Sequence, residues 1–364
     1  MNVAIRVDAS SQIGLGHFMR CLTLANVLKK QEASIRFISR HLPEHLQSAL
    51  IKKGHEVVLL HADFSNVIHY QQAECGDLPH SHWLGTSQEQ DVKDTVAALA
   101  DVQADWLIVD HYALDAHWET NVRQAAKKIL VIDDIADRMH ACDVLLDQNY
   151  YADMHIRYAS KVSQECQLLL GPSYALLRED FALFRKHVKP RLGKIENVLV
   201  FLGGIDAANF TSRALEALAP LKFLKVNVVI GLQHPYKSEI EDTCKKLGFG
   251  CYIQTDKMAE LMASADLAIG AGGSASWERC SLGLPSCIVS LADNQTAIAQ
   301  ALDSIGAVIY LGMLDEVSPE MIQHAVCSLI EKPNRLSALS EISFALVDGL
   351  GANKVCQVLG EFKA

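Results

Sequence analysis

The sequence predicts an α/β protein made of two Rossmann-like domains that face a cleft. The chain has 364 residues, of which 50% are hydrophobic, and this is more than one core usually organises. Short apolar runs alternate with helical patterns along its whole length. Such alternation is typical of a mainly parallel sheet that helices cover on both faces.

The strands expected in the first half end in polar residues. They are Val3–Val7, Ser34–Ile38, Glu56–Leu60, Trp106–Val109, Ile129–Ile132, Val144–Leu146 and Leu168–Leu170. Asp8 follows the first, Asp110-His111-Tyr112 the fourth, Asp133-Asp134 the fifth and Asp147-Gln148-Asn149 the sixth. Because carboxyl ends of parallel strands meet at one edge of a sheet, these polar groups are expected to line a crevice there.

A basic, proline-containing segment, residues 185–194, separates the two halves and lacks an apolar period. We interpret residues 1–186 as the first domain, 187–194 as the linker and 195–364 as the second domain. Six further strands are expected, at Val198–Leu202, Lys225–Ile230, Cys251–Gln254, Leu267–Ile269, Ser286–Ser290 and Ala307–Leu311. Helices from about Pro319 close the chain, and the last of them is a candidate to pack back on the first domain.

Composition excludes several function classes. The formal net charge is −10, and no basic run occurs, which argues against nucleic acid or an anionic membrane as a partner. No long apolar run and no apolar leader are present, so a soluble, cytoplasmic protein is expected. The ten cysteines are scattered without close pairs, as expected for reduced thiols.

The histidines do not predict a metal site. His80-Ser81-His82 is the densest group, and it stands in a polar stretch without a neighbouring cluster of carboxylates or cysteines. No metal and no cofactor are therefore expected.

The turn after the first strand is the strongest local signal. It contains Gly14 and Gly16, followed at once by His17 at the start of a helix. Glycines allow a ligand close to the backbone, free N–H groups at a helix start favour anions, and the imidazole can exchange a proton. The segment predicts a phosphate site with a built-in base; the alternative is an ordinary turn with a structural histidine.

Three segments of the second half repeat this chemistry. The glycine turn Gly272-Gly273-Ser274 precedes Glu278, and we favour phosphates on the turn and ribose hydroxyls on Glu278 over a solvated helix start. Gly203-Gly204-Ile205-Asp206 is equally compatible with a ligand site and with an ordinary turn. Asn294-Gln295 offers amides for sugar hydroxyls, although an isolated pair of this kind is more often a helix cap.

The chain resembles the UDP-sugar hydrolases of pseudaminic acid biosynthesis over nearly its whole length. The motifs that carry the resemblance are Arg6-x-Asp8, Gly14-Leu15-Gly16-His17-x-Met19-Arg20-Cys21, Trp83-Leu84-Gly85, Asp110-His111-Tyr112, Asp133-Asp134, Asp147-Gln148-Asn149, the segment 170–178 and Asp293-Asn294-Gln295. That family hydrolyses UDP-2,4-diacetamido-2,4,6-trideoxy-β-L-altropyranose and is similar to two-domain inverting glycosyltransferases of the peptidoglycan N-acetylglucosaminyltransferase type. The resemblance implies a glycosyltransferase B-like fold.

The resemblance also implies roles for single residues. His17 activates water, the glycine turn with Glu278 holds UDP, Tyr112 and Asn294 contact the sugar, and backbone near Met258 reads uracil. The substrate-binding set that follows is Gly14, Gly16, Arg20, Tyr112, Asn149, Gly203, Gly204, Met258, Gly272, Gly273, Ser274, Glu278, Asn294 and Gln295. Ile205 stands where relatives commonly carry serine, which removes a hydroxyl contact to phosphate.

Some alternatives stay open at this stage. Asp8 is a second candidate for the base, an orienting partner of His17, or a residue that satisfies helix-start N–H groups. A UDP-sugar glycosyltransferase needs an acceptor groove, for which no amphipathic patch is evident in the first domain, and a non-catalytic nucleotide-sugar sensor needs only the glycine turns. The sequence is compatible with a monomer and does not fix the oligomeric state.

Overall fold

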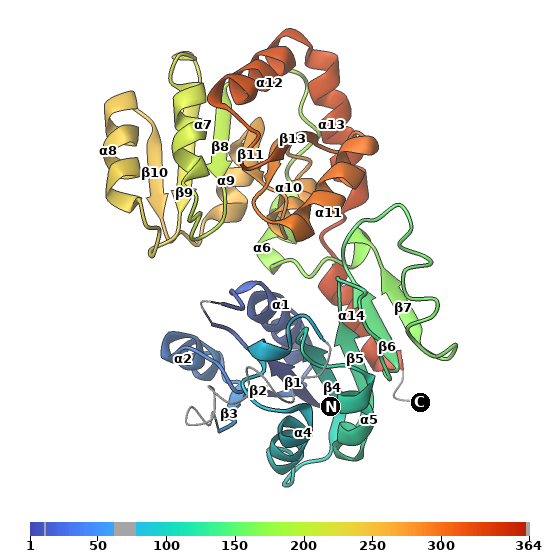
Figure 1. Cartoon of the computed structure of the whole chain (residues 1–364). Coiled ribbons are helices and arrows are strands. Elements are labelled where there is room, and N and C mark those ends of the chain that lie inside the picture. The colour runs from blue at the N-terminus through green and yellow to red at the C-terminus, as the bar shows by residue number, and fades with distance from the viewer. Residues whose placement is uncertain (11, 62–77, 362–364) are drawn as a thin grey trace. The chain divides into compact units, whose positions relative to one another are not determined.

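The computed structural model describes residues 1–10, 12–61 and 78–361, which form two compact units (Figure 1). The first unit comprises Met1–Asn149, Asp153–Leu176 and Gly351–Ala364. The second comprises Tyr150–Ala152 and Leu177–Leu350, so it is inserted into the chain of the first. Each unit is built on a parallel sheet with helical connections, which confirms the predicted fold class.

In the first unit, seven parallel strands lie in the order β3-β2-β1-β4-β5-β6-β7. The order reverses between β1 and β4, and such a switch point opens a crevice at the carboxyl ends of the strands. The elements are β1 (Asn2–Val7), α1 (Gly16–Lys30), β2 (Ser34–Ser39), α2 (Glu44–Lys52), β3 (Glu56–Leu59), η1 (Ser81–Trp83), α4 (Gln88–Ala97), β4 (Ala104–Asp110), α5 (Ala116–Val122), η2 (Arg123–Ala125), β5 (Ala126–Ile132), β6 (Val144–Asp147), β7 (Gln167–Leu170), η3 (Pro172–Tyr174) and α14 (Gly351–Glu361).

The second unit repeats this plan with six parallel strands in the order β10-β9-β8-β11-β12-β13. Its switch point lies between β8 and β11, the strands that precede the two predicted glycine turns. The elements are α6 (Glu179–Arg185), β8 (Asn197–Phe201), α7 (Phe210–Leu218), β9 (Lys225–Ile230), α8 (Lys237–Leu247), β10 (Gly250–Ile253), α9 (Met258–Ser264), β11 (Leu267–Ala271), α10 (Ala275–Ser281), β12 (Ser286–Ser290), α11 (Asp293–Ser304), β13 (Ile309–Met313), α12 (Pro319–Glu331) and α13 (Pro333–Leu346).

Every predicted strand overlaps an observed one, because the buried apolar run is the part of a strand that the sequence marks. The observed ends differ from the predicted ones where a strand extends beyond its continuous apolar run. β5 begins at Ala126, three residues before the predicted Ile129, since Lys128 also pairs in the ladder with β4.

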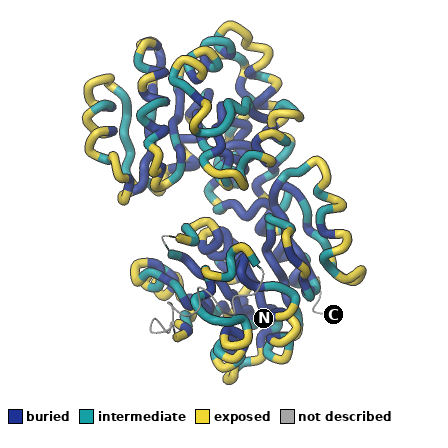
Figure 2. Tube along the Cα trace, in the orientation of Figure 1, coloured by how far each residue is buried: buried dark blue, intermediate teal, exposed yellow. Residues whose placement is uncertain are grey.

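Both faces of the first sheet are buried (Figure 2). Val3, Ile5 and Val7 of β1 pack in one cluster with apolar side chains of α1 and α14, while Ala4 lies on the opposite face in a cluster with side chains of α4 and α5. The alternation follows from the two-residue period of a strand. Trp106 of β4 donates its indole N–H to the carbonyl of Leu359 at 3.1 Å, which fastens α14 to the sheet.

The structure corrects the predicted linker. Residues 177–194 belong to the second unit, and apart from the short stretch Tyr150–Ala152 the chain passes between the units after Leu176 and after Leu350. Arg191, inside the predicted linker, is buried, and its guanidinium donates to four carbonyls, those of Met262, Ala263, Ala265 and Leu282. The basic, proline-containing stretch is predicted as a linker between domains, but Arg191 within it satisfies its N–H groups inside the second unit.

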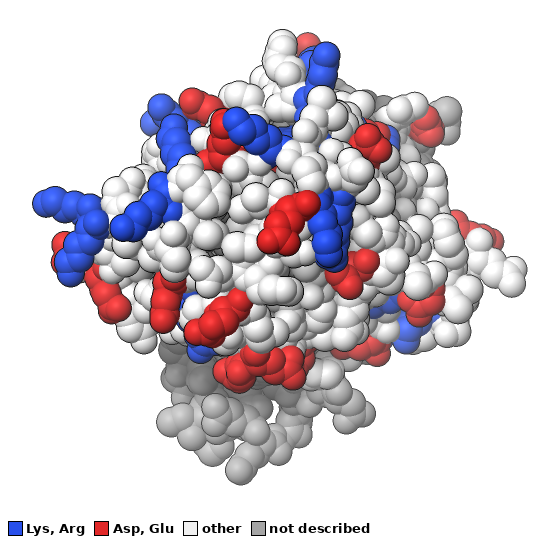
Figure 3. Space-filling view, turned by 90° about the horizontal axis from the view of Figure 1, so that it is seen from above, with Lys and Arg blue, Asp and Glu red and all other residues white. Residues whose placement is uncertain are grey.

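Charges of both signs alternate on the surface in view in Figure 3, where Lys and Arg lie among Asp and Glu without merging into one basic field. This agrees with the excess of 43 acidic over 33 basic residues.

Replacing Leu359 by Ala should destabilise the first unit. The side chain is completely buried among α1 and the strands, and truncating a buried leucine typically costs about 2–5 kcal/mol. Urea unfolding followed by circular dichroism should show that the first unit unfolds at a lower urea concentration than in the wild type. Gln357→Ala, on the exposed side of the same helix, is the matched control and should leave that transition in place; equal midpoints for the two variants would contradict the packing described for α14.

Candidate functional site

The turn between β1 and α1 presents backbone at the carboxyl edge of the first sheet. The hydroxyl of Ser10 accepts from the N–H of Ile13, and the N–H of Gly14 donates to the carbonyl of Ser10 at 2.8 Å. Gly14 has φ of 81°, a conformation that favours glycine. Leu15 precedes the helix and provides no side-chain cap, so the first N–H groups of α1 stay available to a ligand.

His17, in the first turn of α1, is held by Asp110 at the end of β4. Its Nδ1 lies 2.5 Å from Oδ1 of Asp110. Both residues flank the β1/β4 switch point. The carboxylate can only accept, so Nδ1 carries the proton in this contact and Nε2 is the ring nitrogen that can accept another.

Arg20 fixes the same carboxylate from the next turn of α1. Its Nε and Nη2 donate to the two oxygens of Asp110, each at 2.7 Å. Burial alone raises the pKa of Asp110, but Arg20 and His17 together hold that pKa well below its usual range. Asp110 is therefore a permanent carboxylate, and Arg20 has a partner inside the protein rather than a free guanidinium for substrate.

Arg20 also links this pair to Tyr112. Its Nη1 donates to Oδ2 of Asp134 at 2.7 Å, and the hydroxyl of Tyr112 donates to the other oxygen of Asp134. Burial and the Asp134 carboxylate raise the pKa of Tyr112 well above its usual value, so its hydroxyl stays protonated. The structure thus brings three predicted residues, His17, Arg20 and Tyr112, into one hydrogen-bonded network.

Aromatic rings surround His17. The ring of Tyr112 meets the imidazole edge-on with centroids 4.6 Å apart, and Trp83 stacks on Tyr112 at 5.7 Å. His80 contacts both Trp83 and Tyr112. His80 was weighed only as a metal ligand; its role as an aromatic neighbour of the site was missed, and the density of rings in residues 80–83 was the signal that could have found it.

The structure reassigns the partner of His17 from Asp8 to Asp110. Asp8 is fully buried, accepts from both Nη atoms of Arg6 at 2.7 and 3.1 Å, and accepts from the backbone N–H of Arg40 at 2.7 Å. Burial raises its pKa, yet Arg6 and His111 lower it far more. Asp8 therefore holds the ends of β1 and β2 together, which is a structural role other than the contact to helix-start N–H groups that the sequence left open for it.

Asn149 and Asp147 form a second acidic corner at the end of β6. The N–H of Asn149 donates to Oδ1 of Asp147 at 2.9 Å, and Arg157 donates to the other oxygen at 2.7 Å. Burial and the neighbouring Asp134 carboxylate raise the pKa of Asp147 to about 7. Both polar residues lie at the same strand edge as Asp110, as predicted for carboxyl ends of parallel strands.

The two predicted glycine turns of the second unit follow β8 and β11. Side chains placed at Gly203, Gly204 or Gly273 would meet open space or only the end of Gln295, so the backbone there is accessible. Asp206 accepts from the N–H groups of Phe210 and Thr211 at 3.0 and 2.8 Å. It thus caps α7, which is the ordinary turn chemistry weighed for it.

Glu278 lies in the first turn of α10, half-buried. Burial raises its pKa to about 7, and Arg178 and Arg279 oppose that rise only in part. Ser274 immediately precedes α10, and its hydroxyl makes no cap contact. Ser274, Glu278 and the glycine turn before them are thus close together in the chain, and the pKa of the Glu278 carboxyl is raised to about 7.

The remaining predicted residues occupy helix starts. Met258 is buried at the start of α9, so only its backbone can meet a ligand. Asn294 is exposed in the first turn of α11, whereas Gln295 is partly committed, because its Oε1 accepts from the N–H of Leu291 at 3.1 Å. Asn294 thus remains the freer amide of this pair.

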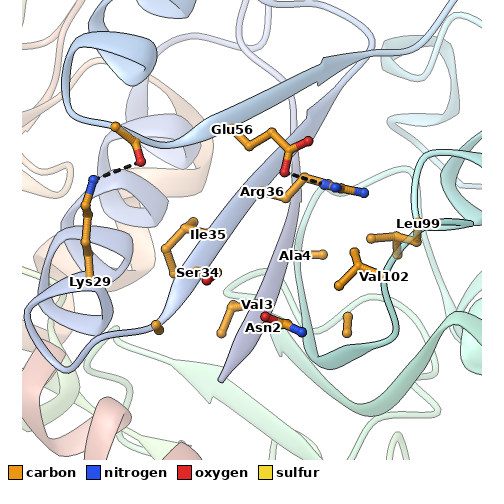
Figure 4. A pocket seen from close by; sticks show the side chains of 13 residues that line it. Asn2, Val3, Ala4, Lys29, Ser34, Ile35, Arg36, Glu56, Leu99 and Val102 are labelled. Carbon is orange, nitrogen blue, oxygen red and sulfur yellow. Dashed lines mark hydrogen bonds and ion pairs between the residues drawn. The ribbon is translucent and has the colours of Figure 1, made fainter.

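A cavity of about 320 Å³ opens at the other edge of the first sheet (Figure 4). Its lining includes Asn2 of β1 and Ser34 of β2, at the amino ends of these strands. Its charged groups are engaged: Arg36 donates to Glu56 at 2.8 Å, and Lys29 donates to the carbonyl of Gly54 at 2.8 Å. The cavity lacks the convergent titratable groups found at the carboxyl edge.

Within residues 1–10, 12–61 and 78–361, no group of three or more His, Cys, Asp or Glu side chains is arranged to hold a metal ion. None of the helices in this described part of the chain has the length and apolar character needed to cross a bilayer.

Comparisons with known proteins agree with this architecture. Residues 197–350 match the family model of the glycosyltransferase family 28 C-terminal domain. A spore coat polysaccharide biosynthesis protein of Bacillus subtilis, SpsG, is 26% identical over 99% of this chain and 98% of its own length. The UDP-2,4-diacetamido-2,4,6-trideoxy-beta-L-altropyranose hydrolase of Campylobacter jejuni is 26% identical over 74% of this chain and 84% of its own length.

A further relative, an uncharacterized protein of Methanocaldococcus jannaschii, is 25% identical over 79% of the chain, which spans 55% of that protein. Among solved structures, MurG of Acinetobacter baumannii superimposes with a TM-score of 0.67 at 14% identity, covering 99% of this chain and 100% of that one. The glycosyltransferase B-like fold predicted from the sequence is thereby confirmed.

Replacing Asp110 by Asn should change the proton position on His17. With the carboxylate present, the neutral ring carries its proton on Nδ1; an asparagine that turns its N–H₂ group toward Nδ1 favours the Nε2–H form instead. Nitrogen-15 NMR of labelled histidine should report this switch. His140→Asn removes another buried ring that pairs with a carboxylate, Glu119 at 2.7 Å, and serves as the control and assignment aid. An unchanged His17 spectrum in Asp110→Asn would contradict the pairing.

Proposed function

We propose that this chain hydrolyses a UDP-activated diacetamido sugar, UDP-2,4-diacetamido-2,4,6-trideoxy-β-L-altropyranose, to the free sugar and UDP, as a step of pseudaminic acid biosynthesis. The observation that carries the proposal is the imidazole of His17, fixed by the buried Asp110 carboxylate at the switch point of the first sheet. The likeness to the Campylobacter hydrolase supports the choice of substrate.

His17 has the features of a general base. Its Nδ1 is committed to Asp110 at 2.5 Å, which orients the ring and stabilises the positive charge that forms when Nε2 takes a proton. In the proposed reaction, a water oxygen bonds to the anomeric carbon, the bond from that carbon to the phosphate oxygen breaks, and the water proton passes to Nε2. A single displacement of this kind inverts the anomeric centre.

The leaving group needs little acid assistance, because UDP departs as a stabilised anion. In the proposal, the turns Gly203-Gly204 and Gly272-Gly273-Ser274 supply backbone N–H groups for the phosphates, and Glu278 accepts from the ribose hydroxyls. Backbone near Met258 contacts uracil, while Tyr112, Asn149 and Asn294 contact the sugar. Arg20 acts through Asp110 and Asp134 rather than on the substrate.

A UDP-sugar glycosyltransferase is the second candidate. The match of residues 197–350 to the glycosyltransferase family 28 C-terminal domain favours it, and the same base could activate an acceptor hydroxyl in place of water. The two functions differ in one measurable respect, since only a hydrolase releases UDP at full rate when water is the sole acceptor.

Incubation of the protein with the purified UDP-sugar in water, with EDTA added, should release UDP and the free sugar, and replacing His17 by Asn should lower the rate about 10²–10⁴-fold. Proton NMR of the anomeric signals follows both products, and calorimetry should show UDP affinity within about threefold of the wild type, because the base does not bind nucleotide.

His117→Asn, an exposed histidine on α5, is the matched control and should keep the wild-type rate. Release of UDP only after an acceptor is added would favour the transferase. Binding of the UDP-sugar without turnover under either condition would leave a nucleotide-sugar sensor. Wild-type turnover in His17→Asn would remove the base assignment.

The affinity for uridine should rise as the pH is raised from about 5.5 to 8. The pKa of Glu278 is raised to about 7, so its carboxyl is neutral at the low end and a carboxylate at the high end, and a carboxylate accepts ribose hydroxyls more strongly. Uridine is chosen because it has no phosphate that titrates in this range. NMR titration of the protein gives the dissociation constants.

Glu278→Gln should bind uridine weakly and with little pH dependence. Glu216→Gln, on α7 and away from the glycine turns, controls for the loss of one acidic charge and should follow the wild-type curve. A pH profile for Glu278→Gln that coincides with the wild type would contradict the ribose assignment.

A further inference from the structure

Arg279 lies behind the glycine turn that follows β11. It belongs to α10 and is only 2% exposed. Its Nη2 donates to the carbonyl of Ala271 at 2.7 Å and to the hydroxyl of Ser276 at 2.9 Å. The guanidinium therefore faces the backbone of the turn from inside the second unit, and it has no direct path to solvent.

The end of β11 is shaped to admit this side chain. A Cβ at Gly270 would lie 2.6 Å from Nη1 of Arg279 and 3.0 Å from the carbonyl oxygen of Phe201. Real Cβ atoms do not approach that closely, so any larger residue would have to push the guanidinium away. Gly270 is thus explained by Arg279, whereas Gly272 and Gly273 lie farther along the turn.

The charge of Arg279 is only partly balanced, because Glu278 attracts it electrostatically without forming an ion pair. Among the residues that the structure describes, Nε and Nη1 have no hydrogen-bond partner, and no carboxylate forms an ion pair with the guanidinium. Burial lowers its pKa to about 10, which still leaves it protonated at neutral pH. A buried cation without an ion-pair partner is costly.

Arg191 shows that this situation is particular to the turn. It is also a buried arginine of the second unit, and burial likewise lowers its pKa to about 10. Its Nε, Nη1 and Nη2 all donate to carbonyl oxygens. By contrast, two guanidinium nitrogens of Arg279, Nε and Nη1, have no hydrogen-bond partner in the described part of the chain, and they lie at the edge where a ligand is expected.

We propose that Arg279 is a positioning residue for an anionic ligand, whose diphosphate it stabilises from behind the turn at residues 270–274. The guanidinium supplies positive potential through the backbone, and by binding the Ala271 carbonyl it offsets a dipole that would repel an anion. This inference rests on the proposed binding of UDP to the same turn. It also explains how a chain with net charge −10 can attract an anion without a basic surface.

The test compares UDP with uridine, two ligands that share the nucleoside and differ in the charged phosphates. Dissociation constants are measured by calorimetry or NMR for the wild type, Arg279→Met, Arg279→Lys and Arg191→Met. In Arg279→Met the affinity for UDP should fall about tenfold or more, as expected for losing one charge several ångströms away. The affinity for uridine should change less than about twofold.

Arg279→Lys separates charge from shape. Measured at about pH 6, where a lysine keeps its positive charge although burial lowers its pKa, the ammonium lacks the planar fork of the guanidinium, and it should recover most of the preference for UDP over uridine. Arg191→Met removes another buried arginine of the second unit and should keep the wild-type preference. Where Arg279→Met does not fold, judged by circular dichroism, Arg279→Gln replaces it, because its amide can still donate to the Ala271 carbonyl.

The outcomes distinguish this inference from the function on which it rests. A wild-type protein that binds UDP no better than uridine contradicts phosphate binding at the turn and thus the proposed function of the second unit. A wild-type preference for UDP that survives in Arg279→Met overturns the inference alone. Loss of the preference in Arg279→Lys as complete as in Arg279→Met assigns Arg279 a purely structural contact and overturns it as well.

Discussion

The buried carboxylate of Asp110 is the constraint on which the carboxyl edge of the first sheet depends. It stands at the end of β4, where water cannot solvate it, so its charge must be balanced by groups from α1. Arg20 supplies two donors and His17 a third. The same pairing that offsets the cost of burying the charge also fixes the imidazole, so one network determines both the stability of this edge and the orientation of His17.

Similar compensation recurs along the strand ends. Asp8 and Asp91 share Arg6, and Asp134 shares Arg20 with Asp110. An arginine that is shared in this way cannot be replaced by a neutral residue without taking donors from two carboxylates at once, at least one of which is fully buried. Some of the acidic residues that give the chain its negative charge are therefore buried. The arginines that pair with them are held in place by these contacts without any ligand.

Strand positions were predictable because a buried strand must be apolar and its polar end must follow at once. The partner of His17 was not, because Asp8, Asp110 and Asp134 all follow strands, and sequence periodicity carries no information on strand order. Only the neighbouring position of β1 and β4 brings Asp110 to the start of α1. Likewise, composition cannot show that Arg191 finds carbonyl partners. The sequence therefore predicts a linker at residues 187–194, where the structure has a segment packed into the second unit.

Because α14 returns to the first sheet, the unit that begins the chain is the last to be completed during synthesis. The second unit is contiguous from Leu177 to Leu350 apart from a three-residue excursion, so nearly all of it emerges from the ribosome in one stretch and can collapse on its own core. In the first unit, the apolar face beside α1 stays uncovered until α14 (Gly351–Glu361) has been synthesised and packs on it. A nascent chain stalled before residue 351 would expose that face.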